Sequence, residues 1–192
     1  EMCIRDSAVS ALPLGFRRIV DNEEIEIGNR IWKVRVGNGH APEHATLWSN
    51  VDDIVLAGDQ IISSISPNLG VYATEPNANP VKEWIDTCHK LSAFASDKHL
   101  TLPGHKLPFT GLKFRLKQMV ENHELALNRL VNFLEKPHTA EECFSILFGK
   151  SIQKSEYGLA LVEAVAHVHY LYLEGTVSRV LDKNGAFRYQ AL

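Results

Sequence analysis

Residues 54–60, Ile-Val-Leu-Ala-Gly-Asp-Gln, decide the fold, because a continuous apolar run ends there abruptly in an acid. Such a run is typical of a strand that is buried on both faces. A segment rich in Pro, Asn and Gly follows over 66–80, then a helical pattern over 80–95 and a second strand over 99–102. The order strand, loop, helix, strand predicts one parallel crossover unit.

Shorter strands precede this unit. Residues 24–27 and 31–36 alternate polar and apolar around a turn at Gly28, which predicts a hairpin. Residues 45–48 form a further short strand. The first half of the chain is therefore expected to hold a mixed sheet, and the fold class is α/β (α+β).

The second half is mainly helical. A helix over 111–134 carries apolar residues along one face. Thr139 and Glu142 form a capping box for a short helix that follows. A third helix is expected over 155–173, with Ser155 as its N-cap.

A final hairpin is expected from strands over 176–181 and 187–190, because Asn184 and Gly185 between alternating residues are a strong hairpin signal. Three helices and a hairpin resemble a winged-helix module. We place the domain boundary near Pro137.

Composition limits the classes of function. The chain has 192 residues, 45% of them hydrophobic, and a formal net charge of −3, so it has no general basic field that would attract nucleic acid. No apolar run approaches the roughly 20 residues that cross a bilayer. The widely spaced Cys3, Cys88 and Cys143 suggest reduced thiols in a cytoplasmic protein. Residues 1–7 look like translated adapter sequence, and we exclude them from the fold.

Three metal-ligating side chains each follow a predicted strand. His40 lies on a Gly-rich turn, Asp59 ends the apolar run, and His105 follows Pro-Gly at the end of the last strand of the crossover unit. Imidazole and carboxylate groups at loop tips, held by rigid strands, are what an open catalytic zinc site needs. Each segment alone is more often an ordinary turn. The three in order, in matching contexts, favour a metal site.

These segments resemble the later metal motifs of the metallo-β-lactamase superfamily, close to its glyoxalase II-like and β-lactamase-like hydrolases. His40 and His44 form an HxxxH pattern, and Asp59 and His105 stand in Gly-Asp and Pro-Gly-His. The resemblance extends over about 17–192, including Leu-Pro-Gly-His-Lys-Leu-Pro-Phe at 102–109 and the final hairpin.

The resemblance implies a site with two zinc ions. His40 would complete a three-histidine site, Asp59 would bridge the ions and orient the nucleophile as a catalytic residue, and His105 would bind the second ion. His44 is either a hydrogen-bonding partner of a ligand or a turn residue. Ser66, Asn68 and Tyr72, in the long loop, either line the substrate pocket or belong to a plain connector.

The superfamily's first motif, HxHxDH, does not occur in this sequence. His167 and His169 come closest, but they lie in a predicted helix, where residues two apart point away from each other. We therefore expect the C-terminal half of an αββα sandwich over 8–136, truncated at its N-terminus, and the winged-helix-like domain over 137–192. The fragment alone is expected to be inactive.

The leading functional prediction is a zinc-dependent hydrolase of small molecules with ester, thioester or amide-type bonds. One alternative is a phosphodiesterase or nuclease of the same superfamily, since a metal pair also serves phosphoryl chemistry. The other is a non-catalytic winged-helix binding module. Its third helix carries Glu156, Glu163 and Glu174 but no Lys or Arg, which favours packing onto the hydrolase domain over binding nucleic acid.

Overall fold

The computed structural model describes residues 14–149 and 151–192, so the segment 1–7 and Cys3 lie outside the described residues. A five-stranded sheet forms its first part, in the order β1-β2-β3-β4-β5. The strands are β1 (Glu24–Ile27), β2 (Arg30–Gly37), β3 (His44–Ser49), β4 (Ile54–Gly58) and β5 (Leu100–Pro103). β1 to β4 pair antiparallel, and β4 pairs with β5 in parallel. The mixed sheet and its crossover are thus confirmed.

The β1–β2 hairpin forms because its two turn residues accept the left-handed conformation. Gly28 has φ 61° and Asn29 has φ 60°. Two consecutive positive φ angles define the turn type whose twist matches that of the flanking strands. The predicted hairpin is confirmed, with Arg30 belonging to the second strand.

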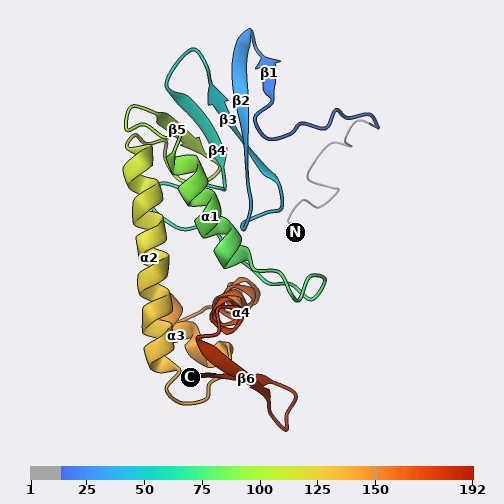
Figure 1. Cartoon of the computed structure of the whole chain (residues 1–192), viewed down its shortest axis with the longest axis vertical. Helices are drawn as coiled ribbons and strands as arrows, with labels where there is room; N and C mark the ends of the chain where they lie inside the picture. Colours follow the sequence, from blue (N-terminus) through green and yellow to red (C-terminus); the bar gives the residue numbers. More distant parts are fainter. Residues whose placement is uncertain (1–13, 150) are drawn as a thin grey trace.

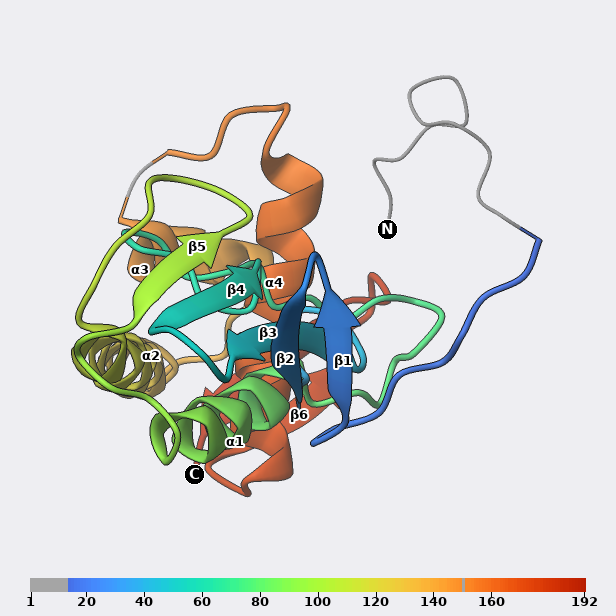
Figure 2. The ribbon, with the colours of Figure 1, turned by 90° about the horizontal axis from the view of Figure 1, so that it is seen from above.

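Two helices cover one face of the sheet (Figure 2). They are α1 (Pro80–Ser92) and α2 (Leu112–Phe133). Trp48 and Val55 of the sheet share a buried cluster with Trp84 and Leu116 of the helices. The core therefore lies between the helices and this face, and α1 ends three residues before the predicted 95.

The opposite face of the sheet is also apolar. The register sets Leu47 beside Leu56, and Leu56 beside Leu102. All three side chains are only partly buried, and Leu100 next to them is 40% exposed. Among the described residues, no second sheet packs on this face, because the other sheet is the β6–β7 hairpin at the far end of the molecule (Figure 1).

The C-terminal part lies at the far end of α2, which runs between the two ends of the molecule (Figure 1). It consists of a 3-10 helix η1 (Glu141–Cys143), α3 (Phe144–Phe148), α4 (Tyr157–Leu173), β6 (Val177–Leu181) and β7 (Phe187–Ala191). The predicted helices and hairpin are confirmed. One detail was wrong: α4 begins at Tyr157, because Ser155 lies inside a turn that the bond from Glu156 N to Gln153 O closes.

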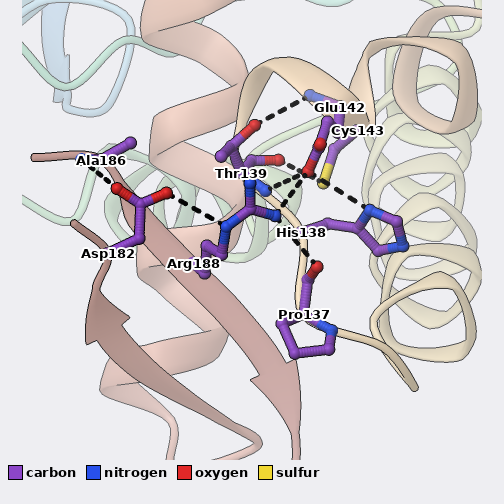
Figure 3. A network of polar contacts seen from close by, with 8 residues as sticks. All are labelled: Pro137, His138, Thr139, Glu142, Cys143, Asp182, Ala186 and Arg188. Carbon is purple, nitrogen blue, oxygen red and sulfur yellow. Dashed lines mark hydrogen bonds and ion pairs between the residues drawn. The ribbon is translucent and has the colours of Figure 1, made fainter. Parts of the chain in front are cut away.

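A polar network ties the hairpin to the short helices (Figure 3). The capping box is present: Thr139 N donates to Glu142 Oε2 at 2.7 Å, and Glu142 N donates to Thr139 Oγ1 at 3.4 Å. Arg188 of β7 reaches the same carboxylate at 3.4 Å and Asp182 at 3.1 Å. One carboxylate therefore both closes the capping box in front of η1 and holds the hairpin.

No helix within the described part of the chain is long and apolar enough to cross a membrane. Cys88 and Cys143 are free thiols in the interior, and burial raises the pKa of Cys143 to about 12.

Candidate metal centre

The three predicted ligands lie together at one edge of the sheet. His40 sits in the turn after β2, Asp59 directly follows β4, and His105 follows β5. Because β4 and β5 run in parallel, their carboxyl ends meet at this edge. His40 Nε2 lies 3.8 Å and His105 Nε2 lies 3.4 Å from Asp59 Oδ2. Asp59 Oδ2 is therefore the point on which both imidazoles converge.

The other oxygen of Asp59 is buried without a partner. Oδ1 makes no hydrogen bond in the described structure. A Cβ added at Gly104 would lie 2.5 Å from this oxygen, and Gly104 N donates to Gly58 O at 2.8 Å. The glycine in the Pro-Gly-His segment thus gives the carboxylate its space. A buried carboxylate oxygen without a partner costs free energy unless a ligand satisfies it.

His44, the first residue of β3, packs on the backbone just before Asp59. A Cβ at Gly58 would lie 2.6 Å from His44 Cε1, and Gly58 has φ 52°. Burial first, and then the neighbouring His40, lower the pKa of His44. Its Nδ1 is buried and has no hydrogen-bond partner among the described residues. A neutral imidazole with a free nitrogen therefore stands beside the predicted ligands.

Gln60 fixes the turn that presents Asp59, a role that sequence reasoning missed. Its side chain is fully buried, and Nε2 donates to Asn38 O at 3.0 Å. Trp84 Nε1 donates to Gln60 O at 3.2 Å. This side chain therefore ties the turn after β4 to the turn that carries His40. A polar residue between an acid and the apolar Ile61 was the one signal in the sequence.

The long loop reaches the site through Asn68. His40 Nδ1 lies 2.9 Å from the backbone oxygen of Asn68. A carbonyl only accepts, so Nδ1 carries the proton and Nε2 faces Asp59 with a free lone pair. Ser66 instead lines a cavity of about 560 Å³ beside α2 and α4 with Glu163, and Tyr72 is 41% exposed. The structure brings only Asn68 into contact with a predicted ligand.

Arg115 of α2 holds the start of this loop and was also missed. Its side chain is 8% exposed, and it donates to Ile62 O at 2.8 Å and to Ile65 O at 2.9 Å. A cation within the apolar face of a predicted helix was the signal that it makes buried hydrogen bonds.

The histidines of α4 lie inside the protein, away from this edge. His167 Nδ1 bonds to Glu163 O at 2.7 Å, and its ring stacks on His123 with centroids 5.5 Å apart. Burial first, and then His123, lower the pKa of His167 to about 4. His169 is 4% exposed. Both residues are therefore buried, and the prediction that they lie in a helix is confirmed.

The residues fit a metal ion in their chemistry but not as a complete cage. Two imidazoles face one carboxylate, whose second oxygen is buried without a partner. In residues 14–149 and 151–192, however, no group of three or more His, Cys, Asp or Glu side chains is arranged to hold an ion by itself. The ligand roles of His40, Asp59 and His105 therefore stay a prediction.

Comparisons with known proteins agree with this fold. Residues 127–192 match the family described as the metallo-β-lactamase-like C-terminal domain. A β-lactamase domain protein from Burkholderia ambifaria is 33% identical with a TM-score of 0.89, over 95% of this chain and 54% of its own. A metallo-β-lactamase family protein from Thermus thermophilus is 28% identical with a TM-score of 0.79, over 95% and 55%.

YqjP of Bacillus subtilis, described as a probable metallo-hydrolase, is 24% identical over 162 residues, which are 81% of this chain and 49% of that protein. The chain thus spans about half the length of the proteins it matches.

The fold defines a class, that of the α/β proteins related to metallo-hydrolases. The C-terminal match and the similarity over 95% of the chain relate it to proteins of the metallo-β-lactamase superfamily.

Proposed function

We propose that this chain supplies one half of the active site of a zinc-dependent hydrolase that cleaves ester, thioester or amide-type bonds of small molecules. The observation that carries the proposal is the convergence of His40 and His105 on Asp59, whose other oxygen has no partner. Deprotonated carboxylate and imidazole groups are ligands that zinc accepts.

In this proposal His40 and His105 ligate metal through Nε2, and Asp59 ligates through its carboxylate. Bound zinc would lower the pKa of a coordinated water to about 7 and supply a hydroxide nucleophile at neutral pH. Asp59 would orient that nucleophile. The neutral ring of His44 packs against Gly58, just before Asp59, and leaves no room for a side chain at position 58.

The same arrangement supports the proposal that the fragment alone is inactive. Three ligands divided between two ions leave most of the coordination positions open, and loss of ligands removes most of the affinity. We propose that the remaining ligands come from an HxHxDH segment upstream of Ala8, within about a hundred residues, the scale of one half-domain.

The test is to read the upstream coding sequence and express the extended protein beside the 192-residue chain. We expect about two zinc ions and zinc-dependent hydrolysis of ester or thioester substrates in the extended protein only. Asp59→Ala in the extended protein should abolish hydrolysis, since the carboxylate that would hold metal is lost. An upstream sequence without HxHxDH, or tight stoichiometric zinc in the short chain, would contradict the proposal.

The rival functions gain no specific support. A nucleic-acid-binding helix needs an exposed face, whereas α4 buries seven residues and contains no Lys or Arg. Salt-dependent binding of the chain to DNA or RNA would revive that alternative.

A further inference from the structure

We propose that Glu163, in α4, is a positioning residue that orients the His40 imidazole by anchoring Asn68. Asn68 Nδ2 donates to Glu163 Oε2 at 2.6 Å and to Leu159 O at 3.2 Å. The backbone oxygen of the same Asn68 accepts from His40 Nδ1 at 2.9 Å. One residue thus connects the C-terminal helix with a predicted metal ligand at the sheet edge.

The loop is also fastened to α4 just after this contact. Val71 N donates to Val162 O at 3.1 Å. Gly70 lies so close that an added Cβ would be 2.8 Å from Val162 Cγ2. Contacts with α4 therefore hold the loop at Asn68 and just after it.

Glu163 is suited to this role because it is partly buried and its carboxylate bonds to Asn68. Burial raises its pKa to about 7, and the hydrogen bond from Asn68 acts in the opposite direction. A bond between an amide and a carboxylate is charge-assisted, so this 2.6 Å contact is strong. Placing a carboxylate in an otherwise apolar helix costs free energy, and the hydrogen bond from Asn68 offsets part of that cost.

The consequence for His40 is its tautomer. An imidazole without a partner favours the Nε2–H form, which presents a proton where a metal would bind. The carbonyl of Asn68 selects the Nδ1–H form and leaves the Nε2 lone pair free. The C-terminal domain thereby prepares a ligand that belongs to the sheet domain.

The experiment measures this tautomer directly. Two-bond proton–nitrogen correlation spectra of the ¹⁵N-labelled metal-free chain are recorded at about pH 8, above the ordinary imidazole pKa of about 6.5. The His40 signals are assigned by their absence from His40→Gln. We expect the Nδ1–H form in the wild type and a shift toward the Nε2–H form in Glu163→Ala and in Asn68→Ala.

Two variants serve as controls. Glu163→Gln keeps an acceptor for the Asn68 amide and should retain the Nδ1–H form. Glu174→Ala removes an exposed carboxylate at the C-terminal end of the same helix and should also retain it. If Glu163→Ala does not fold, Asn68→Ala decides alone, because it removes the anchor and keeps the carbonyl. An unchanged tautomer in either folded alanine variant would overturn the proposal.

The proposal rests on the proposed function only in naming His40 a metal ligand. Zinc titration of the extended protein tests that separately: Glu163→Ala should weaken zinc binding by up to about 10- to 100-fold, the effect typical of losing a direct partner of a ligating histidine, because Asn68 keeps its carbonyl but loses its anchor. If the tautomer shifts occur as expected but the extended protein binds no zinc, the metal assignment is rejected and the positioning role of Glu163 stands. Unchanged zinc affinity in Glu163→Ala would overturn the role in metal binding.

Discussion

At the scale of single residues, Gly104 shows how closely the sheet edge is fitted around Asp59. Replacing it with alanine would put a methyl group 2.5 Å from Oδ1. We expect Gly104→Ala to destabilise the chain by about 1–3 kcal/mol in urea unfolding, because the carboxylate and backbone must move apart. If the extended protein is the hydrolase proposed above, the same displacement should lower its kcat/KM about a hundredfold.

Gly158→Ala is the matched control. Gly158 lies in the first turn of α4, has nothing within 4 Å of an added Cβ, and should be neutral or stabilising by up to about 1 kcal/mol. Equal stability of the Gly104 and Gly158 variants would show that the space beside Asp59 is not tight.

Glu163 gives a second prediction at this scale, on pH. Its pKa is raised from 4.5 to about 7, so the folded state binds its proton more tightly than the unfolded state. The stability that the protonated form contributes is present below pH 4.5 and is lost as the pH rises through 7. Glu163→Gln carries no charge. We expect it to be more stable than the wild type by up to about 3 kcal/mol at about pH 8, and to have no such advantage at about pH 4.5.

Buried histidines also make the free energy of unfolding depend on pH. His167 has a pKa lowered to about 4, so its neutral form stabilises the fold above pH 6.5 and that stability is lost as the pH falls toward 4. The wild type and Glu163→Gln share this loss, so the difference between their free energies of unfolding reports on Glu163 alone. If this difference in unfolding free energy does not vary with pH, the raised pKa of Glu163 is refuted.

At the scale of elements, the C-terminal hairpin depends on Glu142 of η1. We expect Glu142→Ala to lower the free energy of unfolding by about 1–2 kcal/mol, because it removes the cap on Thr139 N and the contact with Arg188 (Figure 3). Glu142→Gln keeps a capping-box residue and loses only exposed ion pairs, so it should lose less than about 1 kcal/mol. Thermal and urea unfolding measure the loss of stability in each variant. Equal losses in Glu142→Ala and Glu142→Gln would show that the charge of Glu142, and not its capping bond, stabilises the hairpin.

The elements themselves were largely predictable, because each carries a local signal. Gly28 and Asn29 mark the first turn, Thr139 and Glu142 mark the capping box, and the apolar periodicity of 111–134 marks the long helix. The start of α4 was not predictable from Ser155, since the turn that contains it depends on backbone bonds alone. Local rules predict existence well and boundaries less well.

The site was predictable to the extent that its groups follow strands. His40, Asp59 and His105 each follow the end of a strand, and parallel neighbours bring such ends together. Gln60, Arg115 and Glu163 support the site across long sequence separations, and no local pattern encodes such contacts. The signal they share is a polar residue among apolar neighbours in the sequence. Such a residue is expected to be buried with a hydrogen-bond partner, but the pattern does not identify that partner.

At the scale of the whole molecule, the sheet is covered by helices on one face only. The register lines up Leu47, Leu56 and Leu102 on the other face, and Leu100 beside them is 40% exposed. Sheets with one apolar face pack that face against another layer. The relatives, of which this chain spans about half, have the length for such a layer.

We therefore expect this chain alone to self-associate through that face, because contiguous exposed apolar area drives association and β5 stands at the edge of the sheet. Leu100→Lys should reduce the fraction of oligomer in sedimentation velocity and the binding of an apolar dye, by desolvation cost and charge repulsion. Leu125→Lys, on the exposed side of α2 at 57% exposure, should change neither. A chain that stays monomeric at about 100 μM with no dye binding would show that the face needs no partner.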